Sequence, residues 1–456
     1  MSWHNVINAL FARPPRFPKM YSLIGKQILA IRLFLYVASS AIYFIFMEAH
    51  APLGIAWRPF HLHRVFNAVN NMINGSPLLQ YGLTSWDSFK RLSPFDQPTD
   101  IYLVSALPHW LHSLLFSIID FDKGVYLAQL CDYILICFVA ALSAEIFSRI
   151  FSFSSMLLNM FWPFCVFLIF LVSPWSYRMM LAPWHEVSWL FLMLLAYYSC
   201  LGGYSRMFMI MVFAAGLFQW QWSFLLGTLF AAVWIARHYS DRPMLQNLLP
   251  PCLNTRKANL QVSLLFFLPF IVCLIQFGLL HIFIPNVSHS GSSVLFRVGI
   301  DNVQNIHHGG WLAAFQFLGG NRFSVCLPKN QIPLSTSIGL FNCIVAIGGW
   351  SFLSVVGLLG YLRICWCRTD LRWLFVPLLW AFMVFLLVFQ QSYAVHLQGY
   401  SFIFSFVFAI GIVHLLSSTI NRAGFSSASS VLIGAPLVSA ILISAIRVSY
   451  FTDVYG

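Results

Sequence analysis

Long apolar runs constrain this chain more than any other feature of its sequence. Eleven runs can be read as membrane-spanning helices: residues 33–47, 126–148, 157–173, 187–201, 207–219, 223–236, 262–284, 340–362, 373–389, 401–417 and 429–446. A helix needs about 20 apolar residues to cross a bilayer. The shorter runs must therefore extend into flanking polar positions, and 207–236 can also be drawn as one span.

The composition fits this interpretation. Hydrophobic residues make up 60% of the chain and charged residues 8%, against about a quarter charged in soluble domains. No soluble domain of ordinary size fits between the runs. We predict an all-α polytopic transmembrane helix bundle of about 11 spans, with residues 1–32 as a cytoplasmic amphipathic tail and 33–456 as a single membrane-embedded domain.

The basic residues indicate the orientation of the spans. With the tail inside, fifteen of the 25 Lys and Arg residues fall in the inner segments, although the outer segments are roughly twice as long. This asymmetry predicts a cytoplasmic N-terminus and a C-terminus outside. The basic residues stand singly or in small groups at span ends, so membrane lipids are the expected partner and nucleic acid is not.

One further apolar stretch, 101–119, is not counted as a span. It contains Pro108, and counting it would invert every later segment and move basic residues to the outside. We expect it to lie along the outer face or dip into it. The predicted outer loops are then 48–124, 174–186, 285–339 and 390–400, where polar, aromatic and Gly-rich residues gather.

The layout of these segments resembles a known family. Glu48 opens a long outer loop after the first span, Pro108-His-Trp-Leu-His112 follows near the interface, Pro174 to Glu186 forms the next outer turn, and a large loop follows the seventh span. This is similar to the GT-C superfamily of integral membrane glycosyltransferases, over about residues 30–340. The resemblance implies a GT-C-like architecture, a polyprenyl-phosphate-sugar donor and a catalytic carboxylate at Glu48.

The sequence departs from the family at that carboxylate. Many members carry two acidic residues together after the first span, Asp-Glu or Asp-x-Asp, whereas this chain has Glu48-Ala-His50. Adjacent histidines such as His307 and His308 rarely bind one ion with good geometry. No cofactor is expected, and a divalent metal is not favoured. The ten cysteines form no zinc framework, and Cys365-Trp-Cys367 is the only close pair.

If the chain catalyses glycosyl transfer, as the resemblance implies, particular residues have expected roles. Glu48 is the candidate general base for the acceptor hydroxyl, and Arg322 and Arg178 are candidates to bind the leaving phosphate. His185 and Glu186 would position the acceptor or help to hold a cation. The remaining candidates would contact sugar or phosphate through hydrogen bonds or stacking: His307, His308, His396 and Trp311. Each is equally an ordinary residue of a membrane interface.

Two other functions remain open from the sequence: a secondary transporter or flippase for a lipid or small solute, and a non-catalytic subunit with a glycosyltransferase-like fold. Asp132 and Glu145 lie near opposite ends of 126–148. Thirteen residues of helix separate them by about 20 Å, so they cannot share a site. A proton-relay transporter would need such carboxylates near mid-membrane, which neither clearly occupies, and this counts modestly against transport. No nucleotide-binding motif occurs, which favours a lipid-linked donor.

Overall fold

The structure, a computed structural model, describes residues 23–50, 84–85, 101–102, 121–153, 155–181, 185–239, 247–251, 256–283, 318–319, 326, 337–388 and 390–455. Its elements in chain order are α2 (Leu23–His50), β1 (Thr84–Ser85), β2 (Ile101–Tyr102), α5 (Phe121–Ile150), α6 (Met156–Val172), α7 (Pro174–Leu181), α8 (His185–Leu201), α9 (Ser205–Phe218), α10 (Trp220–Tyr239), α12 (Arg256–Phe283), α15 (Ser337–Cys367), the 3-10 helix η4 (Thr369–Leu371), α16 (Arg372–Val388), α17 (Gln390–Arg422) and α18 (Ser427–Tyr455).

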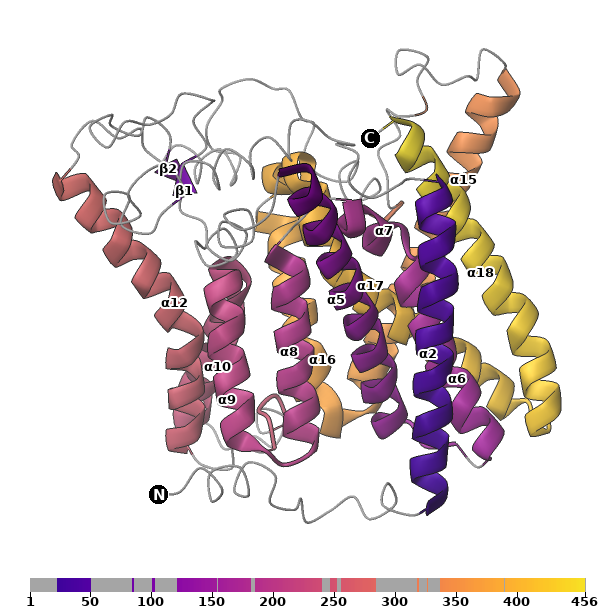
Figure 1. The fold of residues 1–456 in the computed structure, drawn as a ribbon. Helices are drawn as coiled ribbons and strands as arrows, with labels where there is room; N and C mark the ends of the chain where they lie inside the picture. Colours follow the sequence, from indigo (N-terminus) through magenta and orange to yellow (C-terminus); the bar gives the residue numbers. More distant parts are fainter. Residues whose placement is uncertain are drawn as a thin grey trace.

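The long helices stand side by side in one bundle, and successive helices run in opposite directions (Figure 1). The prediction of an all-α membrane fold is confirmed, with each of the eleven apolar runs on its own helix. Within the described residues, five helices are long and apolar enough to cross a membrane, or six if α6 and α7 count as one bent span. Eleven crossings therefore stay a prediction. We call the end where α2 finishes and α5 and α8 begin the upper end, and the opposite one the lower end.

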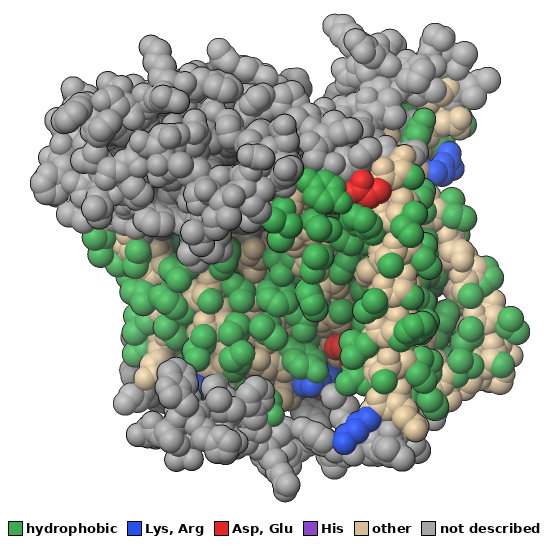
Figure 2. All heavy atoms as spheres, viewed as in Figure 1, with side chains coloured by type: hydrophobic (Ala, Val, Ile, Leu, Met, Phe, Trp, Pro, Cys, Tyr) green, Lys and Arg blue, Asp and Glu red, His purple; other side chains and the backbone are tan. Residues whose placement is uncertain are grey.

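The outer surface of the bundle is suited to lipid. Figure 2 shows hydrophobic side chains in a broad band over one face, with the visible Lys and Arg side chains toward its edges and chiefly along the lower one. On α2, Phe34 and Val37 are each 70% exposed. Apolar side chains at this exposure would be unfavourable in water and cost nothing in a bilayer. The membrane location predicted from the sequence is thus supported by the packing.

The closest helix contact joins α15 to α17, which pack together more extensively than any other described pair. Glycines make this approach possible. A Cβ added to Gly411 would run into the carbonyl oxygen of Gly357, and one added to Gly360 would run into the carbonyl oxygen of Gly411. Small residues allow helix backbones to approach closely in a membrane, where packing replaces the hydrophobic effect between helices.

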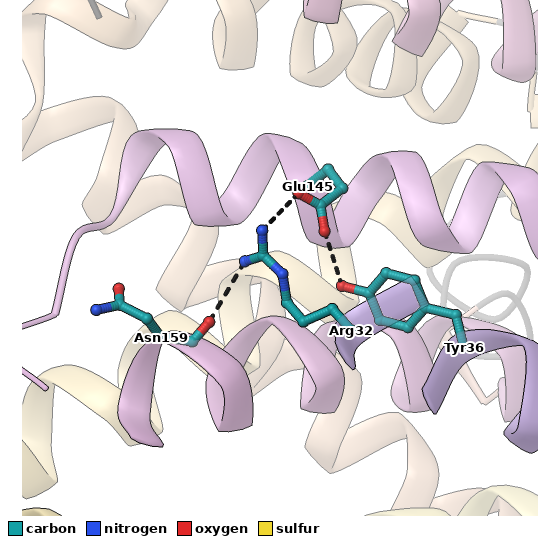
Figure 3. A network of polar contacts seen from close by, with 4 residues as sticks. All are labelled: Arg32, Tyr36, Glu145 and Asn159. Atoms are coloured by element: carbon teal, nitrogen blue, oxygen red, sulfur yellow. Dashed lines mark hydrogen bonds and ion pairs between the residues drawn. The ribbon is translucent and has the colours of Figure 1, made fainter. Parts of the chain in front are cut away.

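A buried ionic network ties α2 to the bundle near the lower end (Figure 3). The Nη2 of Arg32 lies 2.8 Å from Oε2 of Glu145 on α5, and the Tyr36 hydroxyl donates to Oε1 over 3.1 Å. Nη1 of Arg32 also donates to the carbonyl oxygen of Asn159 on α6. The Arg32 and Glu145 side chains are only 6% and 8% exposed. Both charges are therefore paired and hydrogen-bonded, as a buried ion pair requires.

Several local features differ from the sequence prediction. Of the stretch 101–119, only Ile101 and Tyr102 are described, and they pair antiparallel with Ser85 and Thr84 as a short strand. Helices occupy Pro174–Leu181 and Gln390 onward, both within segments predicted as outer loops. The reason is that backbone N–H and C=O groups at membrane depth must be satisfied within the chain. Cys326 and Cys343 form a disulfide that the spacing of the cysteines did not reveal.

Candidate functional site

The upper end collects buried polar groups from three helices and from the break between two others. Arg178 is 5% exposed, Glu186 3%, Gln219 4% and Asp132 9%. Arg178 lies on α7, Glu186 opens α8, Gln219 separates α9 from α10, and Asp132 lies on α5. An ionisable side chain inside an apolar bundle is costly, so such residues mark functional sites more often than surface residues do. We take this group as the candidate site.

Helix α7 owes its place to a break in the chain at Ser173. The Ser173 hydroxyl accepts a hydrogen bond from the backbone N–H of Ser176, and Pro174 occupies the first helical position, where its missing N–H is no loss. The result is a bend of 55° between α6 and α7. A broken membrane helix of this kind brings polar backbone and side chains into the interior of the bundle.

Aromatic packing then fixes α7 against α15 and α17. The Trp175 ring lies 5.7 Å from Trp350, 5.1 Å from Phe404 and 5.6 Å from Phe408, measured between centroids. The Ser173 hydroxyl also lies 3.1 Å from that of Ser405 on α17. Arg178, one turn after Trp175, is therefore held inside the protein. Its burial excludes the simpler interpretation in which it pairs only with lipid headgroups.

Of the two carboxylate oxygens of Glu186, only one accepts a hydrogen bond from a described residue. Gln219 Nε2 donates to Glu186 Oε1 over 3.1 Å, and this bond links the start of α8 to the break between α9 and α10. The run 207–236 is therefore two helices. Glu186 Oε2 is buried and has no hydrogen-bond partner among the described residues. A buried carboxylate oxygen without a hydrogen-bond donor is unfavourable. An oxygen in this state is expected where a substrate or an ion binds.

Asp132 was not among the residues that the sequence predicted for this site. Phe138 on α5 contacts Phe191 on α8, with 6.4 Å between ring centroids. The two helices run in the same direction. Asp132 precedes Phe138 by six residues, a rise of about 9 Å, and Glu186 precedes Phe191 by five residues, a rise of about 7.5 Å. The two acids therefore lie at similar depth on neighbouring helices. Asp132 Oδ2 also lacks a partner within the described residues. A lone Asp in an apolar run was the available signal.

Glu48 lies near the upper end of α2, but inside the helix. The helix continues to His50, and the span defined by apolar length ends at Ala49. One turn below Glu48, the Phe44 ring packs 5.3 Å from Tyr133 of α5. Helix α5 stands between α2 and α8 (Figure 1) and contacts both.

Other predicted site residues fall outside the described part of the chain: Arg322, His307, His308 and Trp311. His185 begins α8 and His396 lies in the second turn of α17, but their side chains are not described. The expected approach of Glu48 to Arg322 also lies outside the described residues. Among those described, no three His, Cys, Asp or Glu side chains could hold a metal ion together, and metal dependence stays untested.

Comparison with solved structures gives a distant likeness in fold. The oligosaccharyltransferase of Archaeoglobus fulgidus in complex with zinc and sulfate is 14% identical with a TM-score of 0.48, over 93% of this chain and 53% of that one. The same enzyme tethered to an acceptor peptide is 14% identical with a TM-score of 0.45, over 92% and 55%. With an inhibitory peptide and a dolichol-phosphate, it is 16% identical with a TM-score of 0.42, over 93% and 56%.

This chain therefore spans little more than half the length of the solved structures that it matches. No family model matches it, and no curated protein matches its sequence. A likeness of this degree carries over no activity and no residue role.

Proposed function

We propose that this chain is a membrane glycosyltransferase, which moves a sugar from a polyprenyl-phosphate donor to an acceptor at the upper end, on the non-cytoplasmic side. The carrying observation is the buried polar group of Arg178, Glu186, Gln219 and Asp132 at that end of the bundle. A donor with a lipid tail reaches such a site through the membrane, and its charged head needs polar groups inside the protein.

The disulfide supports the proposed side of the membrane. Cys326 is joined to Cys343, and Cys343 lies in the second turn of α15, which begins at the upper end. Disulfides form and persist in oxidising compartments and are rare in the cytosol. The charge asymmetry of the sequence assigns the same end to the outside. Both observations favour an upper end outside the cytoplasm and a C-terminus on that side.

In the proposed reaction, the acceptor hydroxyl attacks the anomeric carbon and gives its proton to Glu48. The bond between that carbon and the phosphate oxygen breaks, and the lipid phosphate leaves with the bonding electrons. Arg178, buried on α7, would stabilise the phosphate together with Arg322. Glu186, with Oε2 open, would orient the acceptor by accepting from a hydroxyl. His185, His307, His308, His396 and Trp311 keep their proposed contacts to sugar or phosphate.

The proposal is tested with the purified full chain, a pool of polyprenyl-phosphate sugars and candidate acceptors, by following donor consumption. Glu48→Gln keeps the shape and removes the basicity, so turnover should fall by roughly 10²–10⁴-fold. Asp370→Asn is the matched control, since it removes one negative charge at the exposed lower end. Turnover that survives Glu48→Gln would remove Glu48 as base. Absence of turnover with every donor would favour transport or a non-catalytic subunit.

The transporter alternative is weakened by the ionic network near the lower end. A proton relay along α5 would use Asp132 and Glu145, but Glu145 is bound on both oxygens by Arg32 and Tyr36. A carboxylate fixed in this way is poorly suited to exchange protons with a moving substrate. On α5 only Asp132 remains, and acids at one end of the bundle provide no path across the membrane.

A further inference from the structure

A second cluster of charge lies at the lower end, away from the candidate site. Arg363 lies near the end of α15, and Arg368 directly follows that helix. Nη1 of Arg363 donates to the Ser418 hydroxyl of α17, one turn before Arg422 at the end of that helix. The His414 ring lies 4.8 Å from that of Phe151, and the guanidinium of Arg368 lies 5.9 Å from the same Phe151 ring. We name these four residues, Arg363, Arg368, His414 and Arg422, the basic corner.

The charges of the basic corner are only partly neutralised. Three arginines bring three positive charges, and Asp370 removes one through its two bonds to Arg368. The C-termini of α15 and α17 each contribute roughly half a negative charge. About one positive charge therefore remains. Arg372 weakens the partial negative charge at the C-terminus of α15, because it donates to the carbonyl oxygens of Cys365 and Trp366.

Donors also remain unused. Within the described residues, Arg363 makes one side-chain hydrogen bond, a long one of 3.5 Å from Nη1 to the Ser418 hydroxyl. Arg422 is exposed and makes none there. A guanidinium presents five N–H donors in a planar fork that fits two oxygens of a phosphate. The basic corner thus offers both net charge and free donors to an anion.

The scaffold around these donors is closely packed and borders lipid. The close glycine contact holds α15 against α17, and the Tyr361 hydroxyl donates to the carbonyl oxygen of Phe375 on α16 over 3.0 Å. Just beside the arginines, Leu359 is 57% exposed, Leu362 40% and Trp366 81%. Large apolar side chains at this exposure indicate a lipid-facing surface, and an exposed Trp is typical of headgroup depth.

We propose that the basic corner binds the phosphate of an anionic membrane lipid whose acyl chains lie along the exposed surface of α15. Arg363 and Arg422 supply the fork contacts, while Arg368 stays with Asp370 and closes the site beside Phe151. The adjoining apolar surface selects a lipid over free phosphate, because a soluble anion gains nothing from Leu359, Leu362 or Trp366. This site is independent of glycosyl transfer.

Native mass spectrometry of the purified chain with phosphatidylglycerol, and separately with phosphatidylcholine, tests the site. Wild type should retain one phosphatidylglycerol in preference to phosphatidylcholine. The double variant Arg363→Gln, Arg422→Gln should bind it on the order of 30-fold more weakly, given about 1 kcal/mol for each basic residue near a lipid surface. Arg422→Gln alone, at an exposed position that folding tolerates, should lose about fivefold.

The matched control is Arg206→Gln, which removes the same charge from an exposed arginine near the lower end, at the start of α9. It should leave binding unchanged. Equal losses in Arg206→Gln and Arg422→Gln would overturn the proposal, because they would show general attraction to a basic end. Retention by the double variant would also overturn it. So would full displacement of the lipid by millimolar inorganic phosphate, since the site would then recognise a free anion.

Discussion

Two buried glutamates, Glu145 near the lower end and Glu186 at the upper end, occupy the same bundle in opposite states. Both oxygens of Glu145 are bound, one by Arg32 and one by Tyr36. Glu186 has a neutral amide donor on Oε1, from Gln219, and nothing on Oε2 within the described residues. The first arrangement is closed, since no further ligand can reach the carboxylate without displacing a partner. The second has one open position.

The difference separates structure from function. Burial of a charge is tolerated when a counter-charge and hydrogen bonds replace water, as at Glu145. Where they do not, as at Glu186, stability is lost unless a substrate or ion completes the site. We therefore expect the lower network to stabilise the fold and the upper acid to serve activity. Four predictions test this contrast, in order of decreasing expected effect.

The largest effect is expected from breaking the lower pair. Glu145→Ala leaves the Arg32 charge buried without its partner and should reduce the free energy of unfolding by about 3–5 kcal/mol. The paired replacement Arg32→Met with Glu145→Leu should stay close to wild type, because neither charge is then stranded. Denaturant unfolding in detergent micelles measures both. Equal losses in the single and the paired variant would contradict this interpretation of the network.

The upper acid should respond in the opposite way. Glu186→Gln removes a charge whose second oxygen is unpaired, so the free energy of unfolding should stay level or rise. Glycosyl transfer should fall by roughly 10²-fold, about 2.7 kcal/mol in the activation barrier, because the acceptor is misplaced. Unfolding and turnover are measured on the same preparation. A Glu186→Gln protein with full activity would leave the acid without a role.

A third test asks how much of the scaffold between the two ends depends on packing alone. Gly411→Ala would place a Cβ against the carbonyl oxygen of Gly357, and relief of this overlap should cost about 1–3 kcal/mol of unfolding free energy. Gly349→Ala is the control, since its added Cβ meets nothing within 4 Å. Similar stabilities for the two variants, by thermal unfolding, would show that α15 and α17 can separate freely.

The smallest effect concerns the exposed pair of Arg368 and Asp370. Two hydrogen bonds from Arg368 lower the pKa of Asp370 below its usual value. Stability from this pair is present above the unfolded pKa, near 4, and is lost as pH falls through the folded value. Asp370→Asn should cost at most about 1 kcal/mol at neutral pH, with the difference vanishing in acid. If Asp370→Asn lowered the free energy of unfolding as much as Glu145→Ala does, the exposed and the buried pair would not differ in their contribution to stability.

The sequence indicated parts of the candidate site. Arg178 and Glu186 were recognised because ionisable residues in a short turn between apolar runs are unusual, and both are buried together with Gln219 and Asp132 at the upper end. Asp132 was considered only as half of a relay with Glu145 and then set aside. Their separation along one helix counted modestly against a relay. The comparison of Asp132 with α8 needed the register that Phe138 and Phe191 define.

What the sequence determined by itself is the class of fold. Lipid offers no hydrogen bonds, so each long apolar run has to form a helix, and the periodic alternation of runs and polar segments fixes the bundle. Only the tertiary structure decided which charges are satisfied. Arg32 and Glu145 are 113 residues apart, and Gln219 reaches Glu186 across 33. Partners at such separations are set by helix packing, which depends on shape complementarity that composition and spacing do not encode.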